Sequence, residues 1–303
     1  MPNLLGISLV LLASVAFGFL GLFRHWADAV SNPMLLAIRF LLAAALLAVI
    51  SLFRRDRWPR GPVLLHLFAL GAILYVIEAY TYFEAMARIP VGLVSLLLYT
   101  YPGIVAFLAW SLLREKLSRS SLLALLLAIS GSIVTLWPDL FAAATGAPST
   151  MPLAGIALGL LCAVAYALYI IAGSRLPKDL PALPQSAVVC ASAGLVFAFI
   201  ALLQGASLPS TPTQWYGAIA LAIVGSVIGV TALLAGLARI GPVRAGIVST
   251  VEPVATILVG WLILGQELYT IRLVGGSIIL CAAIIGALSR SPEIAQAKPS
   301  PKA

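Results

Sequence analysis

The sequence predicts an all-α polytopic membrane protein with ten transmembrane helices, built as two inverted five-helix repeats with the N and C termini in the cytoplasm. Three features predict this fold: apolar runs of bilayer length, a repeated set of motifs, and an uneven distribution of Lys and Arg between alternate loops. Apolar residues make up 62% of the 303 residues and charged residues 9%, against about 25% charged in soluble domains. The lipid bilayer is therefore the expected main partner.

Ten apolar runs are each close to the ~20 residues that a helix needs to cross a bilayer. Several begin with a proline, which is tolerated at the first helical position. The predicted spans are 4–23, 33–53, 62–87, 91–113, 120–137, 152–174, 184–204, 212–238, 243–264 and 270–289. They divide the chain into a first repeat (1–138), a linker (139–151), a second repeat (152–289) and a polar cytoplasmic tail (290–303) that we expect to be disordered.

The repeat is visible as short motifs that recur about 151 positions apart. Because each copy would hold an odd number of spans, the second copy must lie upside down in the membrane, as in many secondary transporters. The matching residues are Ala87-Arg88-Ile89 with Ala238-Arg239-Ile240, Pro102 with Pro253, Trp110 with Trp261 and, at a slightly shorter offset, Gly6-Ile7 with Gly155-Ile156.

The orientation follows from the loops. One set of alternate loops and ends holds 14 of the 18 Lys and Arg residues, and the other set holds three, namely Arg24, Arg88 and Arg272. The remaining one, Arg39, lies inside the second span. Because positive residues favour the cytoplasmic side, this bias places both termini there.

The ninth span carries a family signature, Ser249-Thr-Val-Glu252-Pro253, continuing to Trp261 and Gly265. It resembles the second EamA repeat of the drug/metabolite transporter (DMT) superfamily. The stretch from Tyr101-Pro102 to Glu115, and the pair Arg39-Phe40, resemble the first repeat. Gln266-Glu267 departs from the Gly-Glu that is usual there. The resemblance implies ten helices, cytoplasmic termini and metabolite export, and amino-acid exporters such as the YddG-type aromatic amino-acid exporter are the most similar members in length and character.

Ionisable side chains inside a bilayer cost roughly 2.5–3.5 kcal/mol each at mid-helix, so they mark functional candidates. Glu78, Glu252 and Arg39 are the three that lie well inside predicted spans. Glu78 shares a helix face with Tyr75 and Tyr82. It is predicted to bind a substrate ammonium or to carry a proton, or else Arg39 forms a structural ion pair with Glu78 or Glu84.

The second candidate carboxylate, Glu252, lies on a face of small and polar residues with Ser249 and precedes Pro253. We expect a hinge or kink at Pro253 and at its repeat partner Pro102. Glu252 is predicted either to bind substrate and carry a proton or to have a structural or gating role.

Further candidates for substrate binding come from the first, fourth and sixth spans, where polar and aromatic residues fall at similar depth. Each has packing in the protein core as its alternative interpretation. They are Phe17, Ser95, Tyr99, Tyr101, Tyr166 and Tyr169.

These features predict a secondary active transporter or facilitator that exports small metabolites, foremost aromatic or large hydrophobic amino acids, by alternating access around a midplane cavity. An exporter of small cationic or hydrophobic drugs is the alternative. An intramembrane enzyme or receptor is disfavoured, because His25 and His66 lie at opposite membrane edges and no catalytic or metal-binding motif is present. We expect no cofactor, a small-molecule substrate, no nucleic-acid partner, a monomer or weak homodimer, and a bacterial inner (plasma) membrane location.

Overall fold

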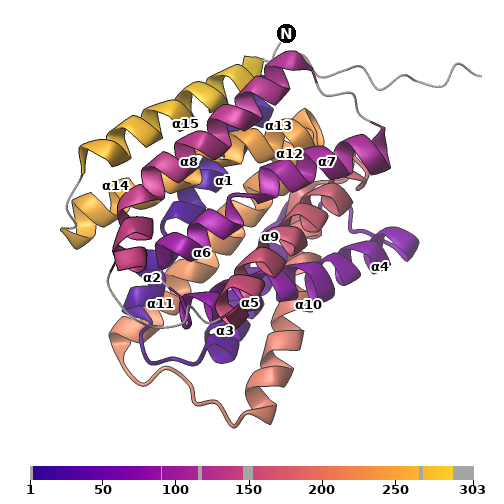
Figure 1. Cartoon of the computed structure of the whole chain (residues 1–303). Coiled ribbons are helices and arrows are strands. Elements are labelled where there is room, and N and C mark those ends of the chain that lie inside the picture. The colour runs from indigo at the N-terminus through magenta and orange to yellow at the C-terminus, as the bar shows by residue number, and fades with distance from the viewer. Residues whose placement is uncertain (1–2, 90, 115–117, 146–152, 266–268, 289–303) are drawn as a thin grey trace, which may run out of the picture.

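The computed structural model describes residues 3–89, 91–114, 118–145, 153–265 and 269–288, and within these ranges all regular structure is helical (Figure 1). The predicted all-helical membrane fold is therefore confirmed. The tail at 290–303 and the linker part at 146–151 lie outside the described residues.

The first half of the chain contains eight α-helices and one π-helical segment in its described residues. Proline occupies one of the first two positions of α3, α4 and α7. The elements are α1 (Leu4–Gly18), α2 (Leu20–Trp26), α3 (Asn32–Phe53), α4 (Gly61–Ala69), η1 (Leu70–Tyr75), α5 (Val76–Met86), α6 (Val91–Leu98), α7 (Tyr101–Leu113) and α8 (Arg119–Thr145).

The second half repeats this order closely. Helices α3 and α10 both have 22 residues, α4 and α11 both have nine, and α7 and α14 both have 13. The elements are α9 (Leu153–Ser174), α10 (Ala182–Leu203), α11 (Pro212–Ala220), η2 (Leu221–Val230), α12 (Thr231–Ile240), α13 (Pro242–Ser249), α14 (Glu252–Leu264) and α15 (Thr270–Leu288).

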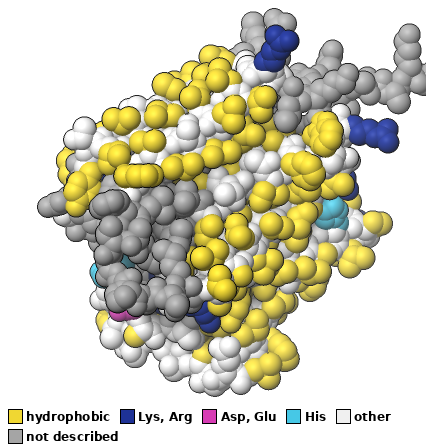
Figure 2. Space-filling model, viewed as in Figure 1, with side chains coloured by type: hydrophobic (Ala, Val, Ile, Leu, Met, Phe, Trp, Pro, Cys, Tyr) yellow, Lys and Arg dark blue, Asp and Glu magenta, His cyan; other side chains and the backbone are white. Residues whose placement is uncertain are grey.

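Eight stretches of the described chain are long and apolar enough to cross a membrane, and two shorter apolar helices accompany them. The short ones, Tyr101–Leu113 and Arg119–Thr135, correspond to the fourth and fifth predicted spans. Figure 2 shows apolar side chains over most of the visible face, with the few charged ones near its rim. The protein is thus a multi-pass membrane protein with a lipid-facing surface, and ten complete spans remain a prediction.

The contacts between helices recur in pairs across the two halves. Helix α3 packs on α10, and α8 packs on α15, as Figure 1 shows for α8 and α15. Helix α1 packs on α12 and on η2, while α9 packs on α5 and on η1. In each of these pairs, a helix of one half therefore contacts a helix or π-helical segment of the other half.

The structure extends one predicted span and divides three others. Helix α8 continues to Thr145, so residues 139–145 are helical rather than part of the linker, and the three alanines 142–144 favour this because alanine has the highest helix propensity. The first predicted span is divided at Phe19. The fourth and ninth spans are each divided near their middle, between α6 and α7 and between α13 and α14.

Close packing of α8 on α15 depends on two glycines. A methyl group added at Gly275 would meet the backbone nitrogen of Thr135 and the carbonyl oxygen of Gly131. Backbone atoms cannot move aside as a flexible side chain can. The two helices approach this closely because glycine has no side chain, as at many membrane helix contacts.

We expect Gly275→Ala to destabilise the protein by about 1–3 kcal/mol, the usual cost of overpacking. The matched control is Gly21→Ala in α2, where an added methyl group meets nothing within 4 Å. It should be neutral or slightly stabilising. Thermal unfolding of the detergent-purified variants measures both, and equal apparent melting temperatures for the two would contradict this packing.

Candidate functional site

Two broken helices meet near the middle of the bundle. Helix α6 ends at Leu98 and α7 begins at Tyr101, while α13 ends at Ser249 and α14 begins at Glu252. Each second segment carries proline as its second residue, Pro102 or Pro253, which suits the first turn of a helix. The sequence predicted a kink at these prolines, and the structure has a full break just before each.

Two π-helical segments occupy equivalent places in the two halves. The first, η1, ends at Tyr75 and the second, η2, ends at Val230. Both terminal residues line the same cavity. π-Helical turns are rare and occur frequently at functional sites. Their position here marks the cavity as the candidate site.

The cavity encloses about 560 Å³ between its lining atoms, counting its open mouth. Residues from the first half supply most of its charged and aromatic groups, and the second half supplies Glu252 and two tyrosines. The lining residues are Phe17, Leu20, Arg39, Tyr75, Glu78, Ala79, Tyr82, Phe83, Leu98, Tyr166, Tyr169, Val230, Leu233 and Glu252.

Most of the substrate-binding candidates named from the sequence come together in this cavity. Seven of them line it: Phe17, Tyr75, Glu78, Tyr82, Tyr166, Tyr169 and Glu252. The apolar lining residues Leu20, Ala79, Phe83, Leu98, Val230 and Leu233 were missed. Apolar residues are abundant in every span, so the sequence holds no signal that distinguishes these from lipid-facing ones.

Four candidates do not line this cavity, and their contact with substrate remains a prediction. Tyr101 is fully buried behind Tyr166, with ring centroids 4.6 Å apart, and its hydroxyl donates to the carbonyl of Gly246 at 3.3 Å. Ser249 and Tyr99 are buried at the helix breaks. Ser95, half-buried on α6, is also absent from the lining.

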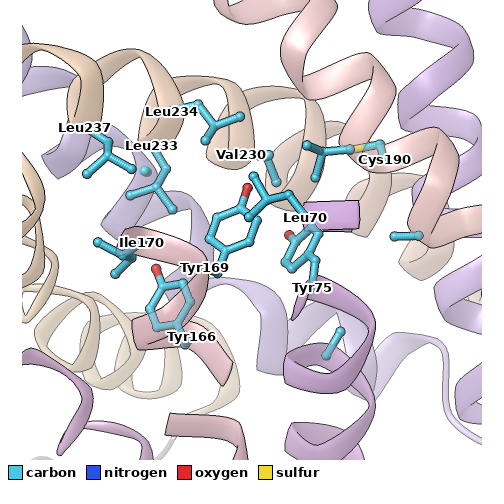
Figure 3. Packing of buried hydrophobic residues seen from close by; sticks show 14 of the residues in the cluster. Leu70, Tyr75, Tyr166, Tyr169, Ile170, Cys190, Val230, Leu233, Leu234 and Leu237 are labelled. Carbon is cyan, nitrogen blue, oxygen red and sulfur yellow. The ribbon is translucent and has the colours of Figure 1, made fainter. Parts of the chain in front are cut away.

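Aromatic rings form a continuous wall on one side of the cavity. Tyr166 packs beside Tyr169 at 6.4 Å, Tyr169 packs against Tyr75 at 5.2 Å, and Tyr75 packs against Phe40 at 4.9 Å. Figure 3 shows the three tyrosines close to Val230 and Leu233. The hydroxyls of Tyr166 and Tyr169 are buried and have no hydrogen-bond partner in the described structure. Unpartnered buried hydroxyls are rare, and here both belong to cavity-lining residues.

Arg39 is held by two neutral partners rather than by a carboxylate. Its Nε donates to Ser226 Oγ at 2.9 Å, and Nη2 donates to the Tyr75 hydroxyl at 3.3 Å. Its guanidinium carbon lies 4.7 Å from the centre of the Phe40 ring. Gly225 leaves room for this arrangement, because a methyl group there would lie 3.3 Å from Nη2.

The predicted ion pair of Arg39 with Glu78 or Glu84 is therefore wrong in this structure. Among the described residues, ion pairs within 4.0 Å join Arg88 to Glu84 and Arg54 to Asp56. Glu84 also accepts a hydrogen bond from Asn32. The physical reason is direction: Arg39 points across to Ser226 on η2, while Glu84 lies near the end of α5 beside Arg88.

The two cavity carboxylates are left without partners. In the described part of the chain, neither the Glu78 nor the Glu252 side chain accepts a hydrogen bond or joins an ion pair. They come from different halves, on α5 and at the first residue of α14. The cavity thus offers one cation, two carboxylates, unpartnered tyrosine hydroxyls and an aromatic wall. The described residues hold no group of three or more His, Cys, Asp or Glu arranged for a metal ion.

Comparison with known proteins gives consistent matches. A family model described as the EamA-like transporter family matches residues 4–137 and again residues 153–287. The uncharacterized transporter YcbK of Bacillus subtilis is 27% identical over 284 residues, which cover 89% of this chain and 88% of that protein. An uncharacterized transporter of Archaeoglobus fulgidus is 27% identical, covering 82% of this chain and 86% of its own length.

A cyanobacterial relative and a solved structure extend these matches. An uncharacterized transporter of Synechocystis is 25% identical, covering 90% of both chains. A crystal structure with 20% sequence identity superposes with a TM-score of 0.79 over 92% of this chain and 95% of that one. At that identity the likeness concerns the fold alone.

Proposed function

The chain belongs to the EamA-like transporter family, and we propose that it exports small metabolites, foremost amino acids with aromatic or large hydrophobic side chains. The observation that carries this proposal is that Glu78 from the first half and Glu252 from the second line one cavity with an aromatic wall. A carboxylate attracts an ammonium group, and tyrosine rings pack on an aromatic or aliphatic side chain.

Alternating access around this cavity follows from two inverted repeats of five helices, which we propose as the plan of residues 1–138 and 152–289. A contact between the two halves supports the inverted repeat, because the same contact occurs once in each half. A methyl group at Gly6 would meet Ile240 and Arg239, and one at Gly155 would meet Ile89 and Arg88. The motifs that repeat in sequence thus contact each other across the halves, once near the start of α1 and once near the start of α9. Two such contacts at opposite ends suit a bundle whose halves rock against each other.

Membrane orientation gives a direct test of this plan. In a variant without its three cysteines, we expect Arg88→Cys to react with a membrane-impermeant maleimide added to intact cells. Arg239→Cys, its repeat partner, should react only after the membrane is permeabilised, because the positive-inside bias places it in the cytoplasm. Labelling of both positions from the same side would rule out inversion. The bacterial relatives support a location in the bacterial plasma membrane.

Export of small cationic or hydrophobic drugs is the second candidate. It is favoured by the excess of carboxylates over cations in the cavity, where Glu78 and Glu252 face a single Arg39. The two candidates differ in one chemical group, because an amino acid also carries a carboxylate. A transport assay with both classes therefore separates them.

Proteoliposomes preloaded with radiolabelled amino acids test the proposed function. We expect phenylalanine and other large hydrophobic amino acids to leave faster than from protein-free liposomes, while quaternary ammonium compounds leave at the protein-free rate. The variant Ala79→Leu, which fills the cavity wall, should slow amino-acid efflux, and Leu65→Ala on the exposed face of α4 should not. Efflux equal to the protein-free rate across the whole panel would refute the proposal.

Proton coupling is proposed for the two unpartnered carboxylates, either of which can bind a proton when no substrate ammonium is present. We expect Glu78→Gln or Glu252→Gln to abolish the dependence of transport on an imposed pH gradient. Glu84→Gln, whose carboxylate is paired with Arg88 outside the cavity, serves as the control and should keep that dependence. If both cavity variants respond to the gradient as the unmodified protein does, neither carboxylate carries the coupled proton.

A further inference from the structure

We propose that Arg39 recognises the carboxylate of the transported substrate, so that the site selects small zwitterions over amines that carry a positive charge alone. This inference rests on the proposed function and names the substrate class more narrowly. Arg39 lines the cavity together with Glu78 and Glu252. A zwitterion is the ligand class that presents one negative and one positive group to such a set.

The guanidinium of Arg39 is fixed in position before any substrate arrives. Its residue is 3% exposed, and Nε and Nη2 are held by Ser226 and Tyr75 while one face lies against Phe40. These restraints come from η2, η1 and α3, three different elements. A side chain held on three sides loses little conformational entropy when it binds a ligand, so its binding energy is available for recognition.

One edge of the guanidinium remains free. Nη1 donates no hydrogen bond to a described residue, yet it is not among the fully enclosed polar atoms that lack a partner. Because Arg39 lines the cavity, Nη1 is the donor that faces the open space. The fork of an arginine matches the two oxygens of a carboxylate, and such charge-assisted hydrogen bonds are roughly twice as strong as neutral ones.

Two observations favour a ligand as the missing partner rather than a protein group. First, no described carboxylate lies within 4.0 Å of Arg39, so this buried cation makes no direct ion pair with the protein. Second, the hydroxyls of Tyr166 and Tyr169 are buried without a hydrogen-bond partner in the described structure, although both residues line the cavity. A polar ligand in the cavity can provide both an anionic partner for Arg39 and hydrogen-bond partners for the two hydroxyls.

The test compares an amino acid with the amine that remains when its carboxyl group is removed. Phenylalanine and phenethylamine share the ring and the ammonium, and another such pair replaces them if a different amino acid moves fastest. In proteoliposomes, we expect the unmodified protein to transport phenylalanine at least about tenfold faster than phenethylamine, the smallest loss expected for a charge-assisted contact.

Variants of Arg39 should change this ratio selectively. Arg39→Gln removes the charge, and we expect it to lower phenylalanine transport about tenfold or more while phenethylamine transport stays unchanged or rises. Arg39→Lys keeps the charge without the fork and should retain part of the preference. Arg88→Gln, outside the cavity, is the charge-matched control and should leave the ratio unchanged.

A variant of Ser226, which holds Arg39 Nε, keeps the test decisive if Arg39→Gln fails to fold. Ser226→Ala keeps the charge of Arg39 but removes the hydrogen-bond acceptor of Nε, so the guanidinium is held less firmly. We expect it to raise the KM for phenylalanine without raising the KM for phenethylamine. A purely structural role for Arg39 would instead lower transport of both compounds together.

The outcomes separate this inference from the proposed function. Equal transport of the amino acid and its amine by the unmodified protein, or a parallel loss of both in Arg39→Gln and Ser226→Ala, overturns the inference and leaves amino-acid export standing. Transport of no amino acid at all overturns the proposed function itself.

Discussion

The hydrogen bond between Arg39 and Ser226 is the interaction on which the site depends. It joins α3 of the first half to η2 of the second and fixes a cation inside the bundle. A charge at this depth is expensive, so the protein must surround it with polar groups and a cavity. Gly225 provides the space for the guanidinium, Phe40 lies under it, and Tyr75 completes its anchoring. The aromatic wall then extends from Tyr75 to Tyr169 and Tyr166.

The repeat explains why this anchor can form at the interface of the halves. Tyr75 and Ser226 occupy equivalent positions, 151 residues apart in the sequence, and both bind the same arginine. Glu78 likewise corresponds to Gly229, which leaves room for the ring of Phe17 on the cavity wall. Equivalent positions therefore carry different side chains in the two halves, and in both pairs only the first-half residue lines the cavity. The scaffold is repeated, and the chemistry of the site lies where the repeat is broken.

The sequence was sufficient for the helical membrane fold and for the cavity carboxylates, because both follow from rules that act locally. A charged residue in a long apolar helix must face protein or water, so Glu78 and Glu252 could be identified without knowing their neighbours. The hydrogen-bond partner of Arg39 could not be identified from the sequence. Charge alone favoured Glu78 or Glu84, but the partner depends on how α3 and η2 are placed, which is set by packing across the whole bundle.

For a similar reason, the sequence could not tell which aromatic candidates line the cavity and which are buried away from it. Tyr166 and Tyr101 lie on helices that both reach the centre, yet Tyr166 lines the cavity and Tyr101 is fully buried behind it. Sequence position gives the depth of a side chain in the membrane but not its rotation relative to neighbouring helices. The breaks before Pro102 and Pro253 add to this, because helical periodicity does not carry across an interruption of the helix.

A structure of the protein with bound 4-bromophenylalanine tests the central claim most directly, because the anomalous signal of bromine locates the ligand independently of the protein density. The account predicts the bromine against the aromatic wall near Tyr169, with the carboxylate within hydrogen-bond distance of Arg39 and the ammonium toward Glu78 or Glu252. A ligand bound outside this cavity, or bound inside it with its carboxylate directed away from Arg39, would contradict the account.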